Sequence, residues 1–395
     1  MNLNRGRPIT SMPGPSIIPD RVLNAMHRSM PNIYEGEIVD VSLSVFDDLP
    51  AIARTSGTAF IAISNGHGAW EMALTNTLRR GHKILVLESG RFAVGWGEQG
   101  QILGADIEVL YAPDRGPVDP AAVEERLRAD ANYEIKAILV VQVDTASGVW
   151  NDIAAIRKAI DAASHPALYM VDCVASLGCV EYLMDDWGID ITVGGSQKGL
   201  MVPPGIGMVW ASDKALAAHQ TADMRTPYWD WTARLSATAH YLRYCGTSPI
   251  QHIYAMREAI DMIKEEGLEN IWHRHSIFAS AVRAAVEAWS TPGGLEFNVK
   301  DPRHRSNSTT TILTGSVNAE QLRILCESNA GLTLGAGLGD LAETSFRIGH
   351  MGHLNPPTVL GTIGTTEAAL AAIGAPVGAS GSAAAAKVIA EALAG

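Results

Sequence analysis

The sequence has 395 residues, of which 47% are apolar and 18% charged, and its formal net charge is −12. This composition is typical of a globular protein with a large core, and the acidic balance argues against nucleic acid as the main partner. No apolar run reaches the roughly 18–20 residues of a membrane span, and no signal-peptide pattern opens the chain. The four cysteines form no CxxC pair, which favours a reducing, cytoplasmic location.

Residues 1–19 are rich in Pro, Gly and Arg and show no periodicity, so we expect an extended N-terminal arm. From residue 20 to 265, short apolar runs alternate with helical patterns. The expected strands are 59–63, 83–88, 106–111, 137–143, 167–172, 189–193 and 206–210, and the expected helices include 69–79, 91–103, 119–129 and 152–163, the last capped by Asp152. Because the strands are continuously apolar, they predict an α/β domain with a mainly parallel seven-stranded sheet covered by helices.

Residues 249–288 predict one or two long helices, and beyond about residue 290 the pattern changes to a smaller α+β unit. Its expected elements are strands at 308–313 and 345–349, a helix at 318–328, and a segment at 366–393 that is helical at both ends. The centre of that last segment, 374–385 (GAPVGASGSAAA), is expected to be a flexible joint. We therefore divide the chain into the arm (1–19), a large domain (20–265) and a small C-terminal domain (266–395).

The first candidate site segment is the Gly-rich turn at 64–71 (SNGHGAWE), between an expected strand and an expected helix. Backbone N–H groups and the positive end of a helix dipole at such a turn suit a phosphate. The signal is weak alone, because many strand–helix turns contain glycine, and the turn matches neither a Walker A sequence nor GxGxxG.

A carboxylate and an amine follow two successive expected strands. Asp172 ends one apolar strand, where it could cap a helix or hold a pyridinium nitrogen protonated. Lys198 follows the next strand and two glycines. It is either a surface lysine or a desolvated amine, whose lowered pKa leaves it neutral and able to attack an aldehyde. Since both residues lie at the carboxyl edge of one sheet, together they favour a pyridine cofactor that carries an aldehyde.

Three longer motifs carry a family resemblance: 195–205 (GSQKGLMVPPG), 266–270 (EGLEN) and 346–352 (FRIGHMG). From Pro13 to Asn355 the chain resembles the class V aminotransferases of pyridoxal-phosphate (PLP) fold type I. Within them it is most similar to the serine-, alanine- and aspartate–glyoxylate aminotransferases. The resemblance implies ping-pong transfer of an amino group from a small amino acid to a 2-oxo acid such as glyoxylate.

The resemblance also implies a role for each matching residue. Lys198 holds the cofactor as a Schiff base and moves the substrate's Cα proton, while Asp172 pairs with the pyridine nitrogen. Arg347 binds the substrate carboxylate through its bidentate fork. The other implied contacts of the cofactor in the same chain are Gly66, His67, Gly68, Phe92, Thr145, Val174 and Gln197. No metal enters the implied site.

The segment at 244–247 (YCGT) matches a family segment that reaches the phosphate from the neighbouring subunit. Tyr244 and Thr247 therefore imply a homodimer with shared active sites. Each functional role competes with a plainer one: Phe92 as core packing, Tyr244 and Thr247 as an ordinary turn, Arg347 as an ion pair, His67 as a loop histidine. We prefer the functional roles because the residues occur together and in the family's order.

The sequence departs from the family at 32–37 (NIYEGE), where many glyoxylate aminotransferases carry a basic stretch near the substrate entrance. Tyr34 and Glu35 should weaken attraction for a second carboxylate, so we expect an amino donor with a neutral or cationic side chain. Serine, alanine, aspartate, a hydroxylated aspartate or another amine all remain open as donors, and pyruvate remains open as acceptor.

Other activities fit parts of the sequence. Pyridoxamine–pyruvate aminotransferase, a related class V enzyme, has a similar Tyr-containing acidic stretch but binds an unphosphorylated cofactor, whereas this chain keeps the residues of a phosphate site. A lyase or a desulfurase of the same class is another alternative. A desulfurase needs a cysteine on a mobile loop, and Cys326 lies in a helical pattern instead. The segment at 335–340 (GAGLGD) lacks the last glycine of a dinucleotide motif, and the two expected domains leave no room for a DNA-binding regulator.

Overall fold

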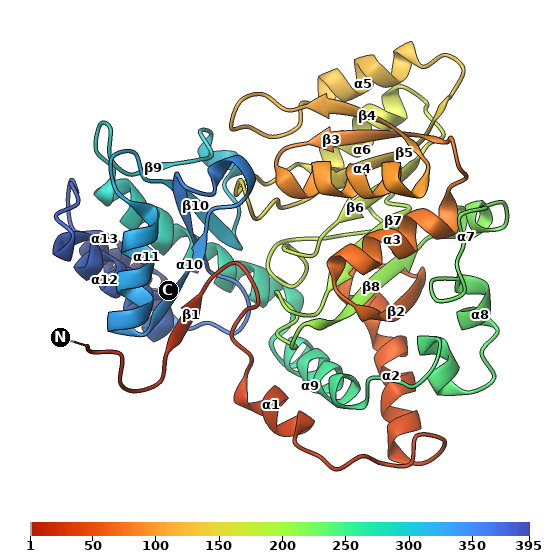
Figure 1. Cartoon of the computed structure of the whole chain (residues 1–395), viewed down its shortest axis with the longest axis horizontal. Coiled ribbons are helices and arrows are strands. Elements are labelled where there is room, and N and C mark those ends of the chain that lie inside the picture. The colour runs from red at the N-terminus through yellow and green to blue at the C-terminus, as the bar shows by residue number, and fades with distance from the viewer. Residues whose placement is uncertain (1) are drawn as a thin grey trace.

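The computed structural model describes residues 2–395 and has two lobes, each built on its own β-sheet (Figure 1). The larger lobe holds a seven-stranded sheet in the order β2-β8-β7-β6-β5-β3-β4. Neighbouring strands are parallel except at β8, which is antiparallel to both of its neighbours. The strands are β2 (Thr58–Ser64), β3 (Lys83–Glu88), β4 (Asp106–Tyr111), β5 (Ile135–Val141), β6 (Leu168–Asp172), β7 (Ile191–Gly195) and β8 (Gly205–Ala211). The seven strands expected from the sequence are confirmed.

The sheet is apolar on both faces because helices cover both. Side chains alternate between the faces along a strand, so Leu85 and Ile138 join one core while their neighbours Val86 and Leu139 join the other. The first core is completed by α2 (Glu37–Ile52), α5 (Pro120–Ala129), α6 (Ile153–Ala162) and α9 (Ile250–Glu266). The second is completed by α3 (Gly66–Thr77), α4 (Arg91–Leu103) and α7 (Asp213–His219). Asp152 caps α6 as expected, accepting a hydrogen bond from the N–H of Ala155 at 2.8 Å.

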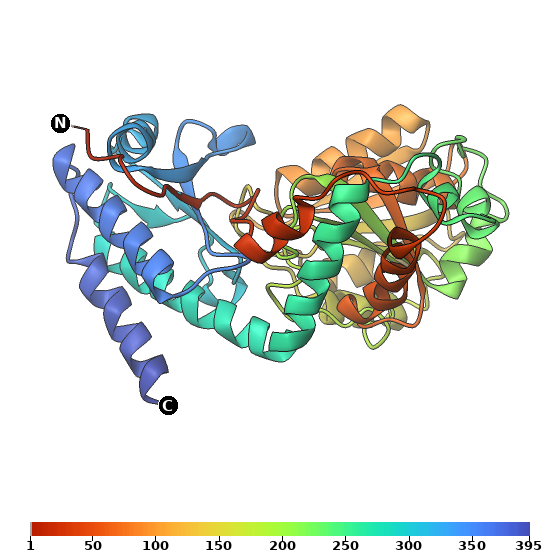
Figure 2. The same ribbon diagram turned by 90° about the horizontal axis from the view of Figure 1, so that it is seen from below.

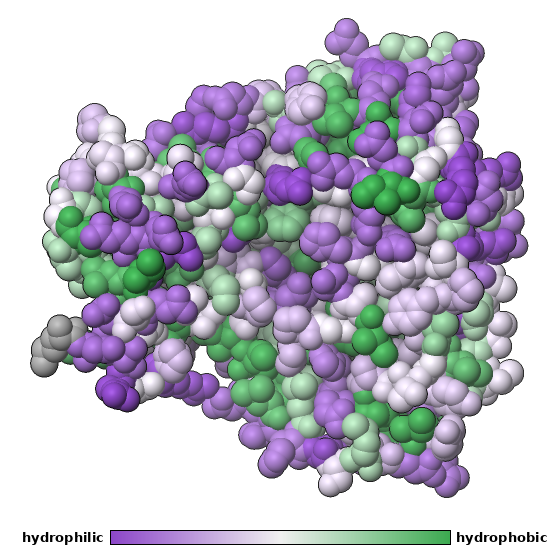
Figure 3. All heavy atoms as spheres, in the orientation of Figure 1, coloured by the Kyte–Doolittle hydropathy of each residue, from purple (hydrophilic) through white to green (hydrophobic). Residues whose placement is uncertain are grey.

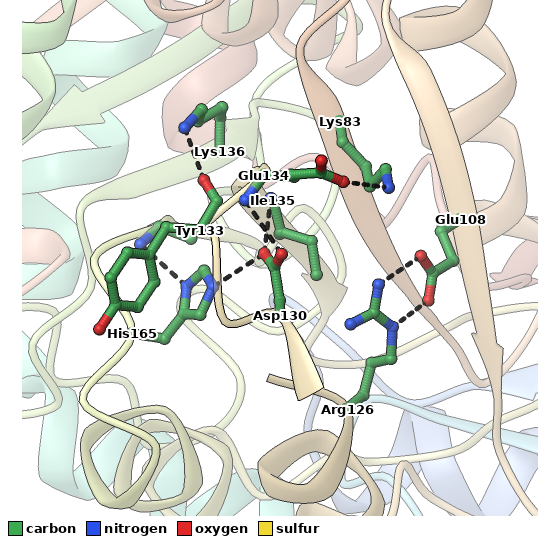
Figure 4. Close-up of polar contacts among 10 residues, drawn as sticks. Lys83, Glu108, Arg126, Asp130, Tyr133, Glu134, Ile135, Lys136 and His165 are labelled. Atoms are coloured by element: carbon green, nitrogen blue, oxygen red, sulfur yellow. Dashed lines mark hydrogen bonds and ion pairs between the residues drawn. The ribbon is translucent and has the colours of Figure 1, made fainter. Parts of the chain in front are cut away.

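A buried carboxylate fixes the loop between α5 and β5 (Figure 4). Asp130 accepts the N–H groups of Glu134 and Ile135 at 3.0 and 2.8 Å, and Nε2 of His165 lies 3.1 Å from its second oxygen. Burial alone would raise the pKa of Asp130, but these donors outweigh it and lower that pKa. The contacts set where β5 begins, and β5 leads directly to the loop that carries Thr145.

The smaller lobe holds a five-stranded sheet in the order β1-β11-β12-β10-β9. Its strands are β1 (Ile9–Ser11), β9 (Glu296–Phe297), β10 (Thr309–Leu313), β11 (Leu332–Ala336) and β12 (Ser345–Gly349). The expected strands at 308–313 and 345–349 and the expected helix at 318–328 are confirmed as β10, β12 and α11 (Ala319–Ala330). β1 was not expected as a strand: part of the extended arm pairs in parallel with β11 and so joins the sheet of the smaller lobe.

Helices α10 (Leu268–Trp289), α11 and α12 (Pro356–Ala372) pack on the smaller sheet, and α13 (Gly381–Ala394) packs on α10 and α12. In Figure 2, α10 extends from the larger lobe along the smaller one. The expected flexible joint at 374–385 is too long, because α13 already begins at Gly381, where Ser380 accepts the N–H of Ala383 at 3.2 Å. The remaining helices are α1 (Asp20–Met26), α8 (Trp231–Leu235) and the short 3-10 helices η1 (His240–Tyr244), η2 (Pro302–His304) and η3 (Gly339–Leu341).

The outer surface shown in Figure 3 mixes small groups of apolar residues with larger hydrophilic areas. Within residues 2–395, none of the helices combines the length and the apolar character that crossing a bilayer would require.

Candidate active site

A cavity of about 250 Å³ lies at the carboxyl ends of the central parallel strands and beside the N-terminus of α3. This is the edge where ligands bind in open α/β sheets. The cavity is lined by Gly14, Pro15, Asn65, Gly66, His67, Trp70, Phe92, Val141, Val143, Thr145, Asp172, Val174, Ala175, Gln197, Lys198 and Pro204. Eight of the eleven cofactor residues expected from the sequence line this cavity, from the ends of the five strands β2, β3, β5, β6 and β7, whereas Gly68, Tyr244 and Thr247 do not line it.

Lys198 is nine-tenths buried at this wall. Burial, followed by the positive charge of Arg347, lowers the pKa of its amine to about 8, because neither a low dielectric nor a nearby cation favours the ammonium form. Its Nζ donates a hydrogen bond to the carbonyl of Pro13 in the N-terminal arm. Lys198 therefore supplies a largely desolvated amine that is neutral in a large fraction of molecules near pH 8.

Asp172 ends β6 and is 4% exposed. Burial raises the pKa of its carboxyl to about 6, although two donors oppose the shift: the N–H of Val174 at 2.7 Å and Nε1 of Trp70 at 2.7 Å. The carboxylate is therefore ionised at neutral pH and each of its oxygens already has one donor. Trp70 was overlooked as a site residue in the sequence, although it stands in the Gly-rich segment at 64–71.

The turn before α3 forms one end of the cavity. Asn65 caps the helix, and its Oδ1 accepts the N–H groups of His67 and Gly68 at 3.1 and 3.3 Å. A methyl group on Gly66 would come within 3.0 Å of Val174, so a side chain there would narrow the cavity. Oε1 of Gln197 is buried and has no hydrogen-bond partner within the described chain. Turning the amide by 180° would place its NH₂ group there, which is the donor that a phosphate needs. The helix N-terminus and this amide suit a phosphate, although Asn65 already engages two of the expected amides.

Phe92 lines the cavity from the first turn of α4, and Thr145 lines it from the loop that follows β5. Both segments are held by Asp144, a fully buried carboxylate that accepts the N–H of Phe92 at 2.8 Å and that of Ala146 at 2.8 Å. The sequence singled out Thr145 but not its neighbour Asp144, because a carboxylate that binds only backbone amides leaves no spacing pattern.

Arg347 lies in β12, behind the wall that Thr145 forms. It is 8% exposed, and its Nε and Nη1 donate to the carbonyls of Ala336 and Thr145 at 2.6 and 2.8 Å. Burial lowers its pKa to about 10, so the guanidinium stays charged at neutral pH. These two bonds fix the plane of the guanidinium and leave Nη2 outside them, but Arg347 is not among the residues that line the cavity.

The N-terminal arm closes over Lys198, which the sequence did not indicate. Ser16 donates its N–H to the carbonyl of Gln197 at 2.9 Å and its hydroxyl to the carbonyl of Lys198 at 2.7 Å. Gly14 packs directly on the lysine side chain. The arm thus forms part of the site as well as a strand of the smaller sheet.

Gly14→Ala should disturb this contact. The new methyl group would lie 2.4 Å from Cδ of Lys198, and the φ of +95° at this position is itself unfavourable for alanine. We expect the covalent capture of pyridoxal phosphate by the apoprotein to slow by about tenfold or more, equivalent to about 1.4 kcal/mol. Gly6→Ala is the matched control, since Gly6 has a φ of +117° but nothing within 4 Å of the added carbon. Equal rates for the two variants would contradict the packing argument.

Two expected pairs do not line the cavity of their own chain. Tyr34 is 69% exposed and Glu35 is also exposed, both in the loop between α1 and α2. Thr247 is exposed, whereas Tyr244 is 1% exposed and its hydroxyl pairs with Ser42 at 2.8 Å. The role of Tyr244 and Thr247 at the phosphate of a neighbouring subunit stays a prediction.

The amine of Lys198 gives the site a pH dependence that can be measured. Only the neutral amine attacks an aldehyde, so the capture of pyridoxal phosphate by apoprotein should rise tenfold per pH unit below the pKa and level off above about pH 8. Arg347→Gln should move this midpoint upward, because it removes a positive charge that lowers the pKa of Lys198. Stopped-flow absorbance at a series of pH values checks both points, and a midpoint near the ordinary lysine pKa of 10.5 would contradict them.

The residues present fit pyridoxal phosphate. The cavity combines an amine for its aldehyde, a carboxylate for its ring nitrogen, an aromatic and a branched side chain for its ring, and a helix N-terminus beside the Gln197 side chain for its phosphate.

Comparisons with known proteins agree with this chemistry. The family model for class V aminotransferases matches residues 52–343. The chain is 40% identical over 373 residues to a serine–glyoxylate aminotransferase of Methylorubrum extorquens, covering 92% of this chain and 91% of that protein. It is 37% identical to an L-aspartate–glyoxylate aminotransferase of Paracoccus denitrificans, covering 93% and 92% of the two chains.

Solved structures give the same fold. The pyridoxamine–pyruvate aminotransferase of Mesorhizobium loti superposes with a TM-score of 0.89 at 26% identity, covering 99% of this chain and 100% of that one. The ureidoglycine–glyoxylate aminotransferase of Bacillus subtilis superposes with a TM-score of 0.87 at 24% identity, covering 98% and 100%. The expected architecture of PLP fold type I is therefore confirmed. The chain belongs to the class V aminotransferases and is a transaminase that depends on pyridoxal phosphate.

Proposed function

We propose that this enzyme transfers the amino group of a small amino acid to a 2-oxo acid, with glyoxylate as the acceptor. The observation that carries the proposal is the meeting of a desolvated amine, Lys198, and a buried carboxylate, Asp172, on the wall of one cavity beside the Arg347 guanidinium. Relatives at 37–40% identity are named as serine–glyoxylate or L-aspartate–glyoxylate aminotransferases, and these names support glyoxylate as the acceptor.

Each residue has a separate task. When bound, pyridoxal phosphate supplies an electron sink for the carbon that loses its proton. Nζ of Lys198 accepts the proton from the substrate's Cα and then donates it at the carbon C4′ of the cofactor, which the lysine pKa of about 8 allows near neutral pH. Asp172 holds a proton at the ring nitrogen, and Arg347 holds the α-carboxylate. The phosphate would be held by Gly66, His67, Gly68 and Gln197. The ring would be held by Phe92, Val174 and Thr145.

A half-reaction screen tests the proposal. The holoprotein is mixed with one amino donor at a time, and the change in cofactor absorbance reports conversion to the pyridoxamine form. Glyoxylate and pyruvate are then compared as acceptors that restore the starting spectrum. We expect small amino acids to convert the cofactor and glyoxylate to restore it faster. Failure of every small amino acid to convert the cofactor would overturn the proposal.

The same screen tests the side chain of the donor. Tyr34 and Glu35 stand where glyoxylate aminotransferases often carry basic residues, and Glu35 adds a negative charge to an exposed loop. We propose that donors with neutral or cationic side chains are preferred. A low KM for aspartate, together with no reaction of neutral amino acids, would count against this preference.

We propose that the enzyme is a homodimer with shared active sites. The ring of Tyr34 packs edge-on against Tyr241 at 5.5 Å, so the 32–37 loop lies against η1, the 3-10 helix that ends at Tyr244. Met30 and Leu242 add exposed apolar area there. Light scattering after gel filtration should give twice the monomer mass. Mixing inactive Lys198→Ala subunits with Thr247→Ala subunits should restore some activity if the sites are shared, whereas a fully active monomer would contradict the proposal.

Pyridoxamine–pyruvate aminotransferase remains the second candidate, supported by the likeness to the Mesorhizobium loti structure. It predicts turnover of free pyridoxamine with pyruvate, and purification without a phosphorylated cofactor. Mass spectrometry of the cofactor released from the purified protein separates the two activities.

A desulfurase is less well supported. Cys326 is fully buried in α11, and burial raises the pKa of its thiol to about 11. Such a thiol is a poor sulfur acceptor. Sulfide release from cysteine that is lost in Cys326→Ala would reverse this conclusion.

We also propose the division into an arm at 1–19, a large domain at 20–265 and a small domain at 266–395. It is supported by the break at Gly267 between α9 and α10, and limited proteolysis should cut near that break before it cuts within either sheet.

A cytoplasmic location is proposed as well, supported by four free cysteines, and cell fractionation tests it.

A further inference from the structure

Trp70 lies on α3, one turn after Gly66 and on the same face of the helix. Four residues correspond to about 6 Å along a helix axis, so a single helix places Gly66 and Trp70 at two points along the cavity that both residues line. Trp70 is 2% exposed, and its Nε1 donates to Oδ2 of Asp172 at 2.7 Å.

The two oxygens of Asp172 are held by different elements. Oδ1 accepts the N–H of Val174, in the loop that follows β6, and Oδ2 accepts the indole of Trp70 from α3. Two donors on separate oxygens fix the rotation of the carboxylate plane. An indole N–H can only donate, so it favours an Asp172 oxygen that carries no proton of its own.

This contact also opposes the effect of burial. Burial raises the pKa of Asp172, whereas the hydrogen bonds from Val174 and Trp70 lower it. Removing the indole N–H would leave a buried carboxylate with one donor fewer, and the charged form would be the one that loses stability.

Packing alone does not account for a tryptophan at this place. Trp70 stacks on Trp96 with ring centroids 5.9 Å apart and planes at 14°, and its ring lies 4.5 Å from that of His67. A phenylalanine could supply similar aromatic contacts. Trp96 provides the contrast, because its buried Nε1 has no hydrogen-bond partner anywhere in residues 2–395, while the indole of Trp70 is committed to Asp172.

We propose that Trp70 is a positioning residue for the cofactor, and that its indole N–H orients the Asp172 carboxylate and keeps it as an acceptor for the protonated ring nitrogen of pyridoxal phosphate. This inference rests on the role proposed above for Asp172. Helix α3 would then contact the phosphate with its first turn, and its second turn would control the ring nitrogen through Trp70 and Asp172.

The test compares two cofactors on the full-length apoprotein: pyridoxal phosphate, and its analogue in which a C–H group replaces the ring nitrogen. Dissociation constants are measured for the wild type and for Trp70→Phe, Trp96→Phe and Asp172→Asn. Trp70→Phe should weaken binding of pyridoxal phosphate by about tenfold, as expected for loss of a hydrogen bond to a charged group. Binding of the analogue should change by less than about twofold, because the analogue has no ring nitrogen for Asp172 to hold.

Trp96→Phe is the matched control and should affect the two cofactors equally. A second readout is the ¹⁵N chemical shift of labelled cofactor, which should move from the protonated toward the unprotonated pyridine value in Trp70→Phe and Asp172→Asn but not in Trp96→Phe. Trp70→His, which retains a ring N–H, should recover part of the preference for pyridoxal phosphate and covers the case in which Trp70→Phe folds poorly.

The outcomes separate the two claims. If Trp70→Phe and Trp70→His weaken both cofactors equally while Asp172→Asn discriminates between them, Trp70 only packs, and the inference is overturned without touching Asp172. If Asp172→Asn also fails to discriminate, the proposed role of Asp172 falls and the inference falls with it.

Discussion

Lys198→Ala is expected to lower kcat by about 10⁴-fold or more, since it removes both the covalent anchor of the cofactor and the base that moves the Cα proton. The rest of the cavity is unchanged by the substitution, so pyridoxal phosphate should still bind, held by the other lining residues. Borohydride treatment followed by mass spectrometry should label the wild type at Lys198 and leave the variant unlabelled.

Two controls sharpen this result. Lys198→Arg keeps a positive charge but supplies no neutral amine at working pH, so it should be nearly as inactive as the alanine variant. Lys214→Ala removes a lysine that pairs with Asp190 at 2.9 Å outside the cavity and should retain activity. Turnover by Lys198→Ala at more than a few per cent of the wild-type rate would remove the central claim.

Arg347→Gln is expected to lower kcat/KM for the amino donor and for the oxo acid by roughly 30- to 3,000-fold. Truncating one partner of a buried, hydrogen-bonded charge pair costs about 2–5 kcal/mol, and 1.4 kcal/mol corresponds to a factor of ten. Because both substrates carry the same α-carboxylate, both half-reactions should suffer alike. Single-turnover kinetics with donor and acceptor measured separately checks this symmetry.

Arg347→Lys separates two effects of Arg347: bidentate binding of the substrate carboxylate, and the effect of its positive charge on the pKa of Lys198. Lysine keeps the positive charge that lowers the pKa of Lys198 but lacks the planar fork for a bidentate carboxylate. We expect weak substrate binding with an almost unchanged pH midpoint of cofactor capture, whereas Arg347→Gln should change both. Near-normal kcat/KM in Arg347→Lys would show that Arg347 acts through its charge alone.

The fold of the larger lobe was predictable because its central strands are buried on both faces. Runs such as 83–88 and 137–143 leave no polar face, and the helical patterns between them require parallel crossovers. The smaller lobe was harder. β1 has only three residues in a Pro- and Gly-rich arm, and it becomes a strand only by pairing with β11, more than three hundred residues later in the chain.

The residues of the candidate site were also only partly predictable from the sequence. Lys198, Asp172 and Arg347 stand at strand ends or in motifs that the sequence displays. Trp70 was not assigned, because an indole that bonds a carboxylate 102 positions away leaves no local pattern. Tyr34 and Glu35 were assigned to the substrate entrance, yet they are exposed and do not line the cavity of their own chain.

By itself, the sequence determined the chemistry of the site and the parallel sheet that carries it, because strand burial and the motif around Lys198 are local properties. Only the tertiary structure decided which groups surround that lysine. The arm reaches Lys198 through Pro13 and Gly14, and Arg347 approaches it from the other sheet. The pKa of the Lys198 amine is therefore lowered by burial and by charges that folding brings together. No single segment of the chain contains all of these groups.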